Sequence, residues 1–125
     1  MSELHGTVHW TELMTHDVPK AKAYYTKVCG WEFDEIPMDE GIYHIARIGE
    51  TMVAGIMDLA DMPGMEAATP YWMTYLAVDD VDAAVKETAA MGGGVHRAPW
   101  DVPDVGRIAM VSDPSGAALG LMTPS

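Results

Sequence analysis

The sequence predicts an α+β domain made of two consecutive βαβββ units. The main reason is an internal repeat: residues 10–31 and 73–94 align without a gap, so that Leu13 matches Leu76 and Asp17 matches Asp80. A second match supports the repeat: VAGIMD at 53–58 resembles ALGLMT at 118–123, and the two segments are separated by nearly the same number of residues as the first pair. Two copies of one supersecondary unit explain both matches.

The first helix is predicted directly after Asp17. This aspartate is a favourable N-cap, and Pro19 falls in the first turn, where its missing N–H costs little. Apolar residues recur at helical spacing from Val18 to Val28, and Gly30 predicts the end of the helix. The strand before this helix is predicted within HWTELMTHD, residues 9–17.

The second helix is predicted after Asp80, with an apolar stripe over 81–91. The sequence SDPSG at 112–116 suits a type I turn between two strands. Three strand-like runs follow each helix: 31–37, 41–48 and 52–59 in the first copy, and roughly 94–98, 107–112 and 117–122 in the second.

Length and composition favour one domain over residues 1–125. Its predicted parts are a βαβββ unit at 6–60, a polar linker with Pro and Gly at 61–70, and a second unit at 71–123. A chain of 125 residues is long enough to bury a hydrophobic core without disulfides or a metal. No apolar run is long enough to cross a bilayer, so no membrane partner is expected.

The chain is acidic, with a formal net charge of −12 and only seven Lys and Arg residues. Such a charge repels a phosphate backbone, so nucleic acid is not an expected partner. The single Cys29 cannot form an internal disulfide, and the first residues do not resemble a signal peptide. We therefore expect a cytoplasmic protein in which Cys29 is a small core residue.

Three stretches carry a resemblance to a known superfamily: YYTKVCGWEF, YLAVDDVDAAVKETAAMGGGV and GRIAMVSDPSGAALGLM. Together with the repeat, they make the chain resemble the vicinal oxygen chelate (VOC) superfamily of glyoxalases, bleomycin resistance proteins and extradiol dioxygenases. More narrowly, the chain looks like its glyoxalase-like, hydroxylase-annotated subgroup. The resemblance implies that each unit curls a mixed sheet into half of a cup around a small ligand, and that two copies form a homodimer.

The resemblance also implies where a metal would bind. Metal-dependent members supply one ligand from the first strand of each unit and one carboxylate from the last strand. Carried over by position, these sites fall on Trp10, Met73, Gly55 and Gly120. None offers an imidazole, carboxylate or thiolate, which are the donors that divalent metals prefer. No cofactor is therefore expected, although a divalent metal held by non-standard ligands stays open, since the chain has five histidines.

Strand alternation predicts which side chains line the cup. Thr11, Leu13 and Thr15 should face the helix, so their neighbours in the strand should face the ligand. The resulting lining is apolar, aromatic and rich in methionine. The predicted ligand-binding residues are Trp10, Met14, Tyr43, Arg47, Gly55, Met57, Met73, Gly120 and Met122.

Glu12 is the main candidate for chemistry, because a partly desolvated carboxylate on the cup face suits proton transfer. Tyr75 occupies the equivalent position of the second unit, so a catalytic Glu12–Tyr75 pair across the cup is a hypothesis. The alternative is that Glu12 only forms a bond that holds the fold. Packing is the favoured interpretation for Trp72, a surface or packing position for His44, and a structural ion pair for Arg107.

Three functions follow from these patterns. The first is metal-independent binding of a small, partly apolar organic molecule in the cup. The second is a divalent-metal lyase, epimerase or dioxygenase with non-standard ligands. The third is a binding or regulatory module without chemistry, so the sequence leaves open whether the protein is an enzyme.

Overall fold

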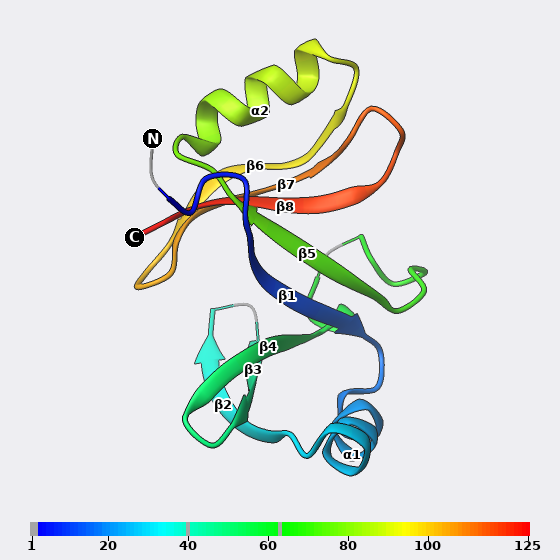
Figure 1. The fold of residues 1–125 in the computed structure, drawn as a ribbon. Coiled ribbons are helices and arrows are strands. Elements are labelled where there is room, and N and C mark those ends of the chain that lie inside the picture. Colours follow the sequence, from blue (N-terminus) through cyan, green and yellow to red (C-terminus); the bar gives the residue numbers. More distant parts are fainter. Residues whose placement is uncertain (1–2, 40, 63) are drawn as a thin grey trace. The chain divides into compact units, whose positions relative to one another are not determined.

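The structure is a computed structural model that describes residues 3–39, 41–62 and 64–125 (Figure 1). Its contacts divide the chain into two compact units. The first unit is residues 10–72, and the second joins the segment before Trp10 to residues 73–125. That segment belongs with the second unit because Gly6 N–H donates to the carbonyl of Ala77 (2.7 Å) and Ala77 N–H donates to the carbonyl of Thr7 (2.9 Å).

The first unit has the predicted βαβββ order. It comprises β1 (Val8–Thr15, from Trp10 onward), α1 (Val18–Cys29), β2 (Glu32–Met38), β3 (Gly41–Ile48), β4 (Thr51–Asp58) and the short 3₁₀ helix η1 (Leu59–Asp61). Its strands lie in the order β2-β3-β4-β1. The pairing of β1 with β4 is parallel and the others are antiparallel, so the sheet is mixed.

The second unit repeats this plan. Its elements are β5 (Tyr71–Ala77, from Met73 onward), α2 (Val81–Ala90), β6 (Gly94–Val102), β7 (Gly106–Ser112) and β8 (Ala118–Pro124). The strands lie in the order β5-β8-β7-β6, again with one parallel and two antiparallel pairings. The predicted α+β class with two βαβββ units is therefore confirmed.

Both helices begin at the predicted aspartates. The Asp17 carboxylate accepts a hydrogen bond from Lys20 N–H (3.0 Å), and the Asp80 carboxylate accepts one from Ala83 N–H (3.1 Å). Each contact satisfies a backbone donor that the first turn leaves without an intrahelical partner. Gly30 ends α1 in the left-handed conformation (φ 73°), which a residue with a Cβ adopts only at a cost.

Each unit buries a core between its helix and one face of its sheet. In the first, Leu13, Val18 and Ile56 form the buried centre, and Phe33 packs against it. In the second, the centre is Val81, Ala109, Val111 and Leu121, with Leu76, Val78, Ala84, Val85 and Leu119 around it. Leu13 and Leu76 thus face the helices, as strand alternation predicted, so their neighbours in β1 and β5 point to the other face.

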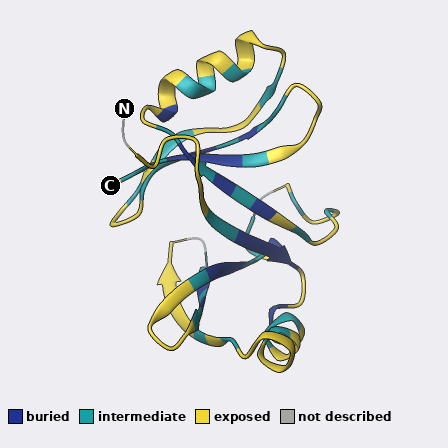
Figure 2. Cartoon of the chain, in the orientation of Figure 1, coloured by how far each residue is buried: buried dark blue, intermediate teal, exposed yellow. Residues whose placement is uncertain are grey.

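The prediction of Cys29 as a core residue is wrong, and parts of both apolar stripes are exposed. Tyr24 and Val28 of α1 are 57% and 60% exposed, and Cys29 is exposed as well. Only Val18 of this helix is buried, and Figure 2 shows most of α1 in the exposed colour. The apolar stripe of α1 therefore covers more of the helix surface than the part that packs against the sheet. Met91, which directly follows α2, is also exposed.

The strand bounds agree closely with the prediction except in β6. This strand runs to Val102, four residues beyond the predicted end. Its register with β7 shifts between Val95 and Arg97 and again between Arg97 and Trp100. Such bulges break the two-residue alternation from which a strand is predicted. Within the described residues, no helix combines the length and apolar character that crossing a membrane requires.

His44 is a packing residue, one of the two outcomes favoured for it. Its side chain lies on the helix-facing side of β3 and is 8% exposed. Among the described residues, nothing hydrogen-bonds its buried Nδ1. Burial lowers the pKa of His44, with a further lowering by the charge of Lys22, against opposing contributions from Glu35, Asp58 and Asp61. The neutral imidazole is the form that this face accommodates.

Candidate functional site

The face of the first unit that turns away from α1 carries the predicted ligand-binding residues of that unit. In the parallel pairing of β1 with β4, Glu12 lies beside Gly55 and Met14 beside Met57. In the antiparallel pairing of β3 with β4, Gly55 lies beside Ile45, two residues from Tyr43. Because paired residues point to the same side of a sheet, these side chains share one face with Trp10.

A hydrogen-bonded chain joins three of these side chains. The Trp10 indole N–H donates to the Tyr43 hydroxyl oxygen at 2.7 Å, and the Tyr43 hydroxyl is hydrogen-bonded to Glu12. Indole is only a donor, so Tyr43 accepts from Trp10 and donates its own proton to the carboxylate. Glu12 is 8% exposed, and its buried carboxylate is thus held by a specific donor.

The electrostatics of this chain keep both nearby tyrosines protonated. Burial raises the pKa of Tyr43 far above its ordinary value, and the charge of Glu12 and the hydrogen bond to it raise it further, outweighing the opposite effect of Trp10. Burial and the Glu12 charge likewise raise the pKa of Tyr71, at the start of β5. Both phenols that respond to the Glu12 charge are therefore neutral.

Gly55 is glycine because Tyr43 occupies the space above it. A Cβ built on Gly55 would overlap the hydroxyl oxygen and Cζ of Tyr43 and lie 2.9 Å from its Cε1. The last-strand position that the resemblance implies for a metal-binding carboxylate is thus covered by a phenol. Tyr43 was predicted from the sequence as a lining residue, but its bond to Glu12 was not.

The second unit has the same feature, built from a different strand. Tyr75 of β5 pairs with Gly120 of β8, and a Cβ built on Gly120 would overlap the flank of the Tyr75 ring and lie 2.9 Å from its Cγ. Tyr75, Met73 and Met122 are all nearly buried, at 4%, 4% and 3% exposed. Both last-strand positions therefore lie under a tyrosine, which comes from β3 in one unit and from β5 in the other.

Two arginines considered in the sequence analysis, Arg47 and Arg107, are held in ion pairs. Arg47 shares the face of Tyr43, but its guanidinium is paired with Asp34 (2.9 Å) and Glu32 (3.4 Å). Arg107 forms a structural ion pair, as favoured, with Asp82 (2.8 Å) and Asp101 (3.3 Å). The predicted contact of Glu12 with Tyr75, and the cup formed from both units, stay predictions.

Trp72 packs within an aromatic cluster, as favoured. Its indole N–H donates to the Tyr25 hydroxyl (3.2 Å), and its ring contacts those of Tyr25 and Trp31 edge to face. The cluster lies on the first unit, where Tyr25 also stacks on Trp31. These rings satisfy one another, so they are not part of the Glu12 site.

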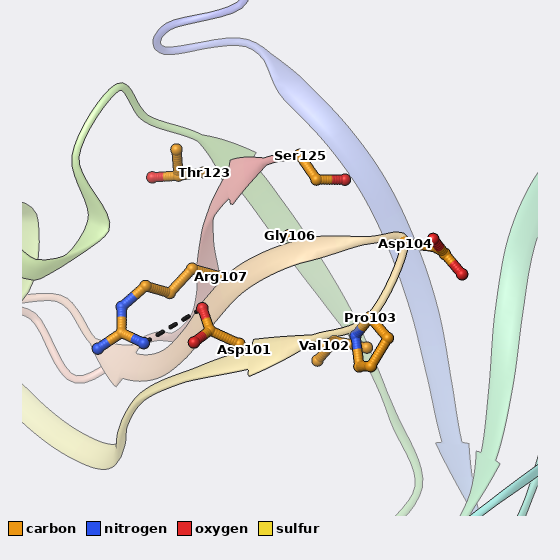
Figure 3. Close-up of a pocket in the computed structure, with 8 residues that line it drawn as sticks. All are labelled: Asp101, Val102, Pro103, Asp104, Gly106, Arg107, Thr123 and Ser125. Atoms are coloured by element: carbon orange, nitrogen blue, oxygen red, sulfur yellow. Dashed lines mark ion pairs between the residues drawn. The ribbon is translucent and has the colours of Figure 1, made fainter.

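Two surface hollows also lie outside that site. One, of about 450 Å³, lies at the β6–β7 turn and the end of β8, where Figure 3 shows Arg107 turned toward Asp101. The other, of about 540 Å³, lies beside α1 and is lined by residues that include Lys20, Tyr24 and Tyr25. Neither hollow could be predicted from the sequence, because each is formed by turn and surface residues without a recognisable motif.

Metal ligands do not gather in the described parts of the chain. Over residues 3–39, 41–62 and 64–125, no three His, Cys, Asp or Glu side chains lie close enough together to hold a metal ion. The four positions that the resemblance implies for metal ligands hold an indole engaged with Tyr43, a buried thioether and two glycines covered by tyrosine rings. This donor set does not fit a divalent metal.

Comparison with known proteins identifies relatives of similar sequence. The protein named "Putative glyoxylase CFP32" of Mycobacterium tuberculosis is 41% identical over 119 residues, which cover 93% of this chain and 45% of that protein. The anthracycline biosynthesis protein DnrV of Streptomyces peucetius is 35% identical over 121 residues, covering 94% of this chain and 41% of that protein. The chain thus spans less than half the length of these curated relatives.

Solved structures share the fold at low sequence identity. Methylmalonyl-CoA epimerase from Mycobacterium tuberculosis superposes with a TM-score of 0.67 at 14% identity, covering 100% of this chain and 93% of the epimerase. A superfamily member from Vibrio splendidus 12B01 gives 0.61 at 19% identity, covering 94% and 99%. A family model matches residues 7–121. The chain therefore belongs to the Glyoxalase/Bleomycin resistance protein/Dioxygenase superfamily, as its sequence motifs indicated.

Proposed function

We propose that the chain is a metal-independent member of its superfamily that binds a small, partly apolar organic molecule on the face carrying Trp10, Glu12 and Met14. The observation that carries this proposal is the chain of hydrogen bonds from Trp10 through Tyr43 to Glu12. Small-molecule sites typically combine apolar and aromatic walls with a few fixed polar groups. The methionines of the face supply the walls, and the chain fixes the carboxylate.

The donor set supports a function without a metal. A carboxylate from β4 is ruled out at Gly55 as long as Tyr43 covers it. Glu12 is a nearly buried ionisable group of this face, and its carboxylate can accept hydrogen bonds or a proton from a bound molecule. Tyr75 of the second unit is the second proposed proton-transferring group, since its hydroxyl is the polar end of a nearly buried ring.

The relatives support an organic ligand. DnrV is named as a protein of anthracycline biosynthesis, and one solved structure of the fold is methylmalonyl-CoA epimerase bound to methylmalonyl-CoA. Both names refer to organic molecules rather than to macromolecules. For this chain we propose only the class, a small organic molecule with an apolar part.

The proposed function includes a homodimer in the cytoplasm. Members of the superfamily commonly pair their units across a two-fold axis, which supports the dimer. Cys29 is exposed and has no second cysteine in the chain, and a reducing compartment keeps such a thiol unoxidised.

Substitution of Glu12 tests the proposed function. Binding of small aromatic alcohols, ketones and amines should shift the NMR signal of the Trp10 indole N–H, assigned with Trp10→Phe. In Glu12→Gln we expect the best of these compounds to bind at least about tenfold more weakly, because the amide loses the charge of the carboxylate. The melting temperature should change little, since Gln keeps the size and an acceptor for Tyr43.

Glu35→Gln is the matched control. Glu35 is an exposed carboxylate of β2 that pairs with Lys22 at 3.6 Å, on the other face of the sheet. Its substitution should leave binding unchanged. If Glu12→Gln lowers the melting temperature while binding at the Trp10 signal is unaffected, Glu12 only holds the fold and the proposed function is wrong.

A further inference from the structure

The buried ring of His44 has one nitrogen without a hydrogen-bond partner. The side chain lies on the helix-facing side of β3, beside Glu35 of β2 and Ile56 of β4, and is 8% exposed. Its Nδ1 is enclosed, and no group in the described part of the chain bonds to it. A neutral imidazole fits this position, because its other nitrogen can carry the ring proton and leave Nδ1 as an unused acceptor.

Protonation changes what Nδ1 requires. An imidazolium carries a proton on both ring nitrogens, so the Nδ1–H of His44 would be a buried, charged donor without an acceptor. Such a donor gives up its bonds to water and gains none in return, which makes its burial costly. This cost does not depend on the tautomer of the neutral ring, since the imidazolium has only one form.

Charged groups from four elements act on His44. They are Lys22 of α1, Glu35 of β2, Asp58 of β4 and Asp61 of η1. The three carboxylates favour protonation, but none of them bonds to Nδ1. Glu35 pairs with Lys22 at 3.6 Å, and the Asp58 carboxylate accepts the N–H of Ala60 at 2.9 Å. Burial and the Lys22 charge outweigh the acids, so the pKa of His44 is lowered.

We infer that His44 makes the first unit sensitive to acid: protonation of its ring loosens β3 from the elements that cover it, because only then can water bond to the Nδ1–H. No ligand takes part in this transition. Lys22, which is positively charged, adds to the effect because it lies on the helix that faces β3 and repels the imidazolium.

The direction of the pH dependence follows from the two states of the chain. The unfolded chain binds a proton at His44 near the ordinary histidine pKa of 6.5, whereas the folded chain binds it only at lower pH. The unfolded state therefore holds more protons in this range, and the stability of the fold decreases as the pH drops through it. Above this range the ring is neutral in both states, and its contribution to stability does not change with pH.

Urea unfolding of the full chain at about pH 7.5 and about pH 5.5 tests the inference. Phenylalanine has a ring of similar size that cannot be protonated, so His44→Phe is the informative variant. Between the two pH values, we expect the unfolding equilibrium constant to increase at least about threefold more in the wild type than in His44→Phe. His96→Phe is the matched control, because His96 is an exposed histidine of β6 in the second unit. It should keep the pH dependence of the wild type.

Hydrogen exchange localises the change. Amides of β3 should exchange faster on acidification relative to those of β7, the equivalent strand of the second unit, and this difference should be absent in His44→Phe. Equal changes in β3 and β7 would overturn the inference, as would the same pH dependence of unfolding in the wild type and His44→Phe.

An NMR titration of the His44 ring in the wild-type chain needs no variant and decides the question even if His44→Phe does not fold. A midpoint below the ordinary histidine value supports the inference. An ordinary or raised midpoint would overturn it, because the folded chain would then accept the proton as readily as the unfolded chain.

Discussion

Gly120→Ala is expected to destabilise the protein by about 3 kcal/mol, although alanine is ordinarily the better residue in a strand. The reason is the Tyr75 ring, whose flank occupies the place of the new Cβ. Tyr75 is 4% exposed, so its ring has little room to turn aside. Urea unfolding followed by circular dichroism measures the free energy of unfolding in both proteins.

The Tyr75→Ala background provides the control for Gly120→Ala. With the ring removed, the added methyl meets no ring atoms, so we expect its cost to vanish or change sign. The difference between the two backgrounds is the coupling between residues 75 and 120. An equal cost in both backgrounds would show that the ring is not what requires glycine at this position.

Gly55→Ala is expected to cost about 2 kcal/mol for a related reason. Here the new Cβ meets the hydroxyl end of Tyr43, so the ring must shift away from Gly55. That movement strains the bonds of Tyr43 to Trp10 and Glu12. Urea unfolding should therefore show lower stability, and the NMR signal of the Trp10 indole N–H should move.

The Tyr43→Ala background tests this explanation. Gly55→Ala should be neutral or stabilising there, since no phenol covers the position. The Trp10 signal, already displaced by loss of its acceptor, should not move further. Unchanged stability and an unchanged Trp10 signal in Gly55→Ala alone would contradict the placement of Tyr43 over Gly55.

The elements that the sequence predicted well are those with a local signal. Asp17 and Asp80 begin the helices because each accepts a hydrogen bond from a backbone N–H that the first turn leaves without an intrahelical partner. Alternation in β1 placed Leu13 against α1 and Glu12 on the other face, since side chains of a strand alternate strictly. The duplication then carried the same assignment to β5, where Leu76 packs toward α2.

Features that depend on contacts between residues far apart along the chain could not be predicted from the sequence. The bond of Tyr43 to Glu12 joins two strands that are not neighbours in the sheet, across Gly55 of β4 between them. A glycine in a strand indicates that another group can occupy the space above it, but it does not indicate which ring does so. The repeat even misleads here, because the ring over Gly120 comes from β5 rather than from the strand equivalent to β3. Tyr24 fits the helical spacing of apolar residues in α1 but is exposed, because such spacing does not indicate how much of a helix face is covered.

Metal content tests most directly whether the inherited metal site has been lost. Freshly purified, untagged protein is analysed for metals before and after dialysis against zinc, nickel, manganese and iron. Since Trp10, Met73, Gly55 and Gly120 offer no suitable donors, we expect well under about a tenth of an equivalent per chain in every case. A stoichiometric metal that survives dialysis would contradict this expectation and would show that the chain binds metal through other residues.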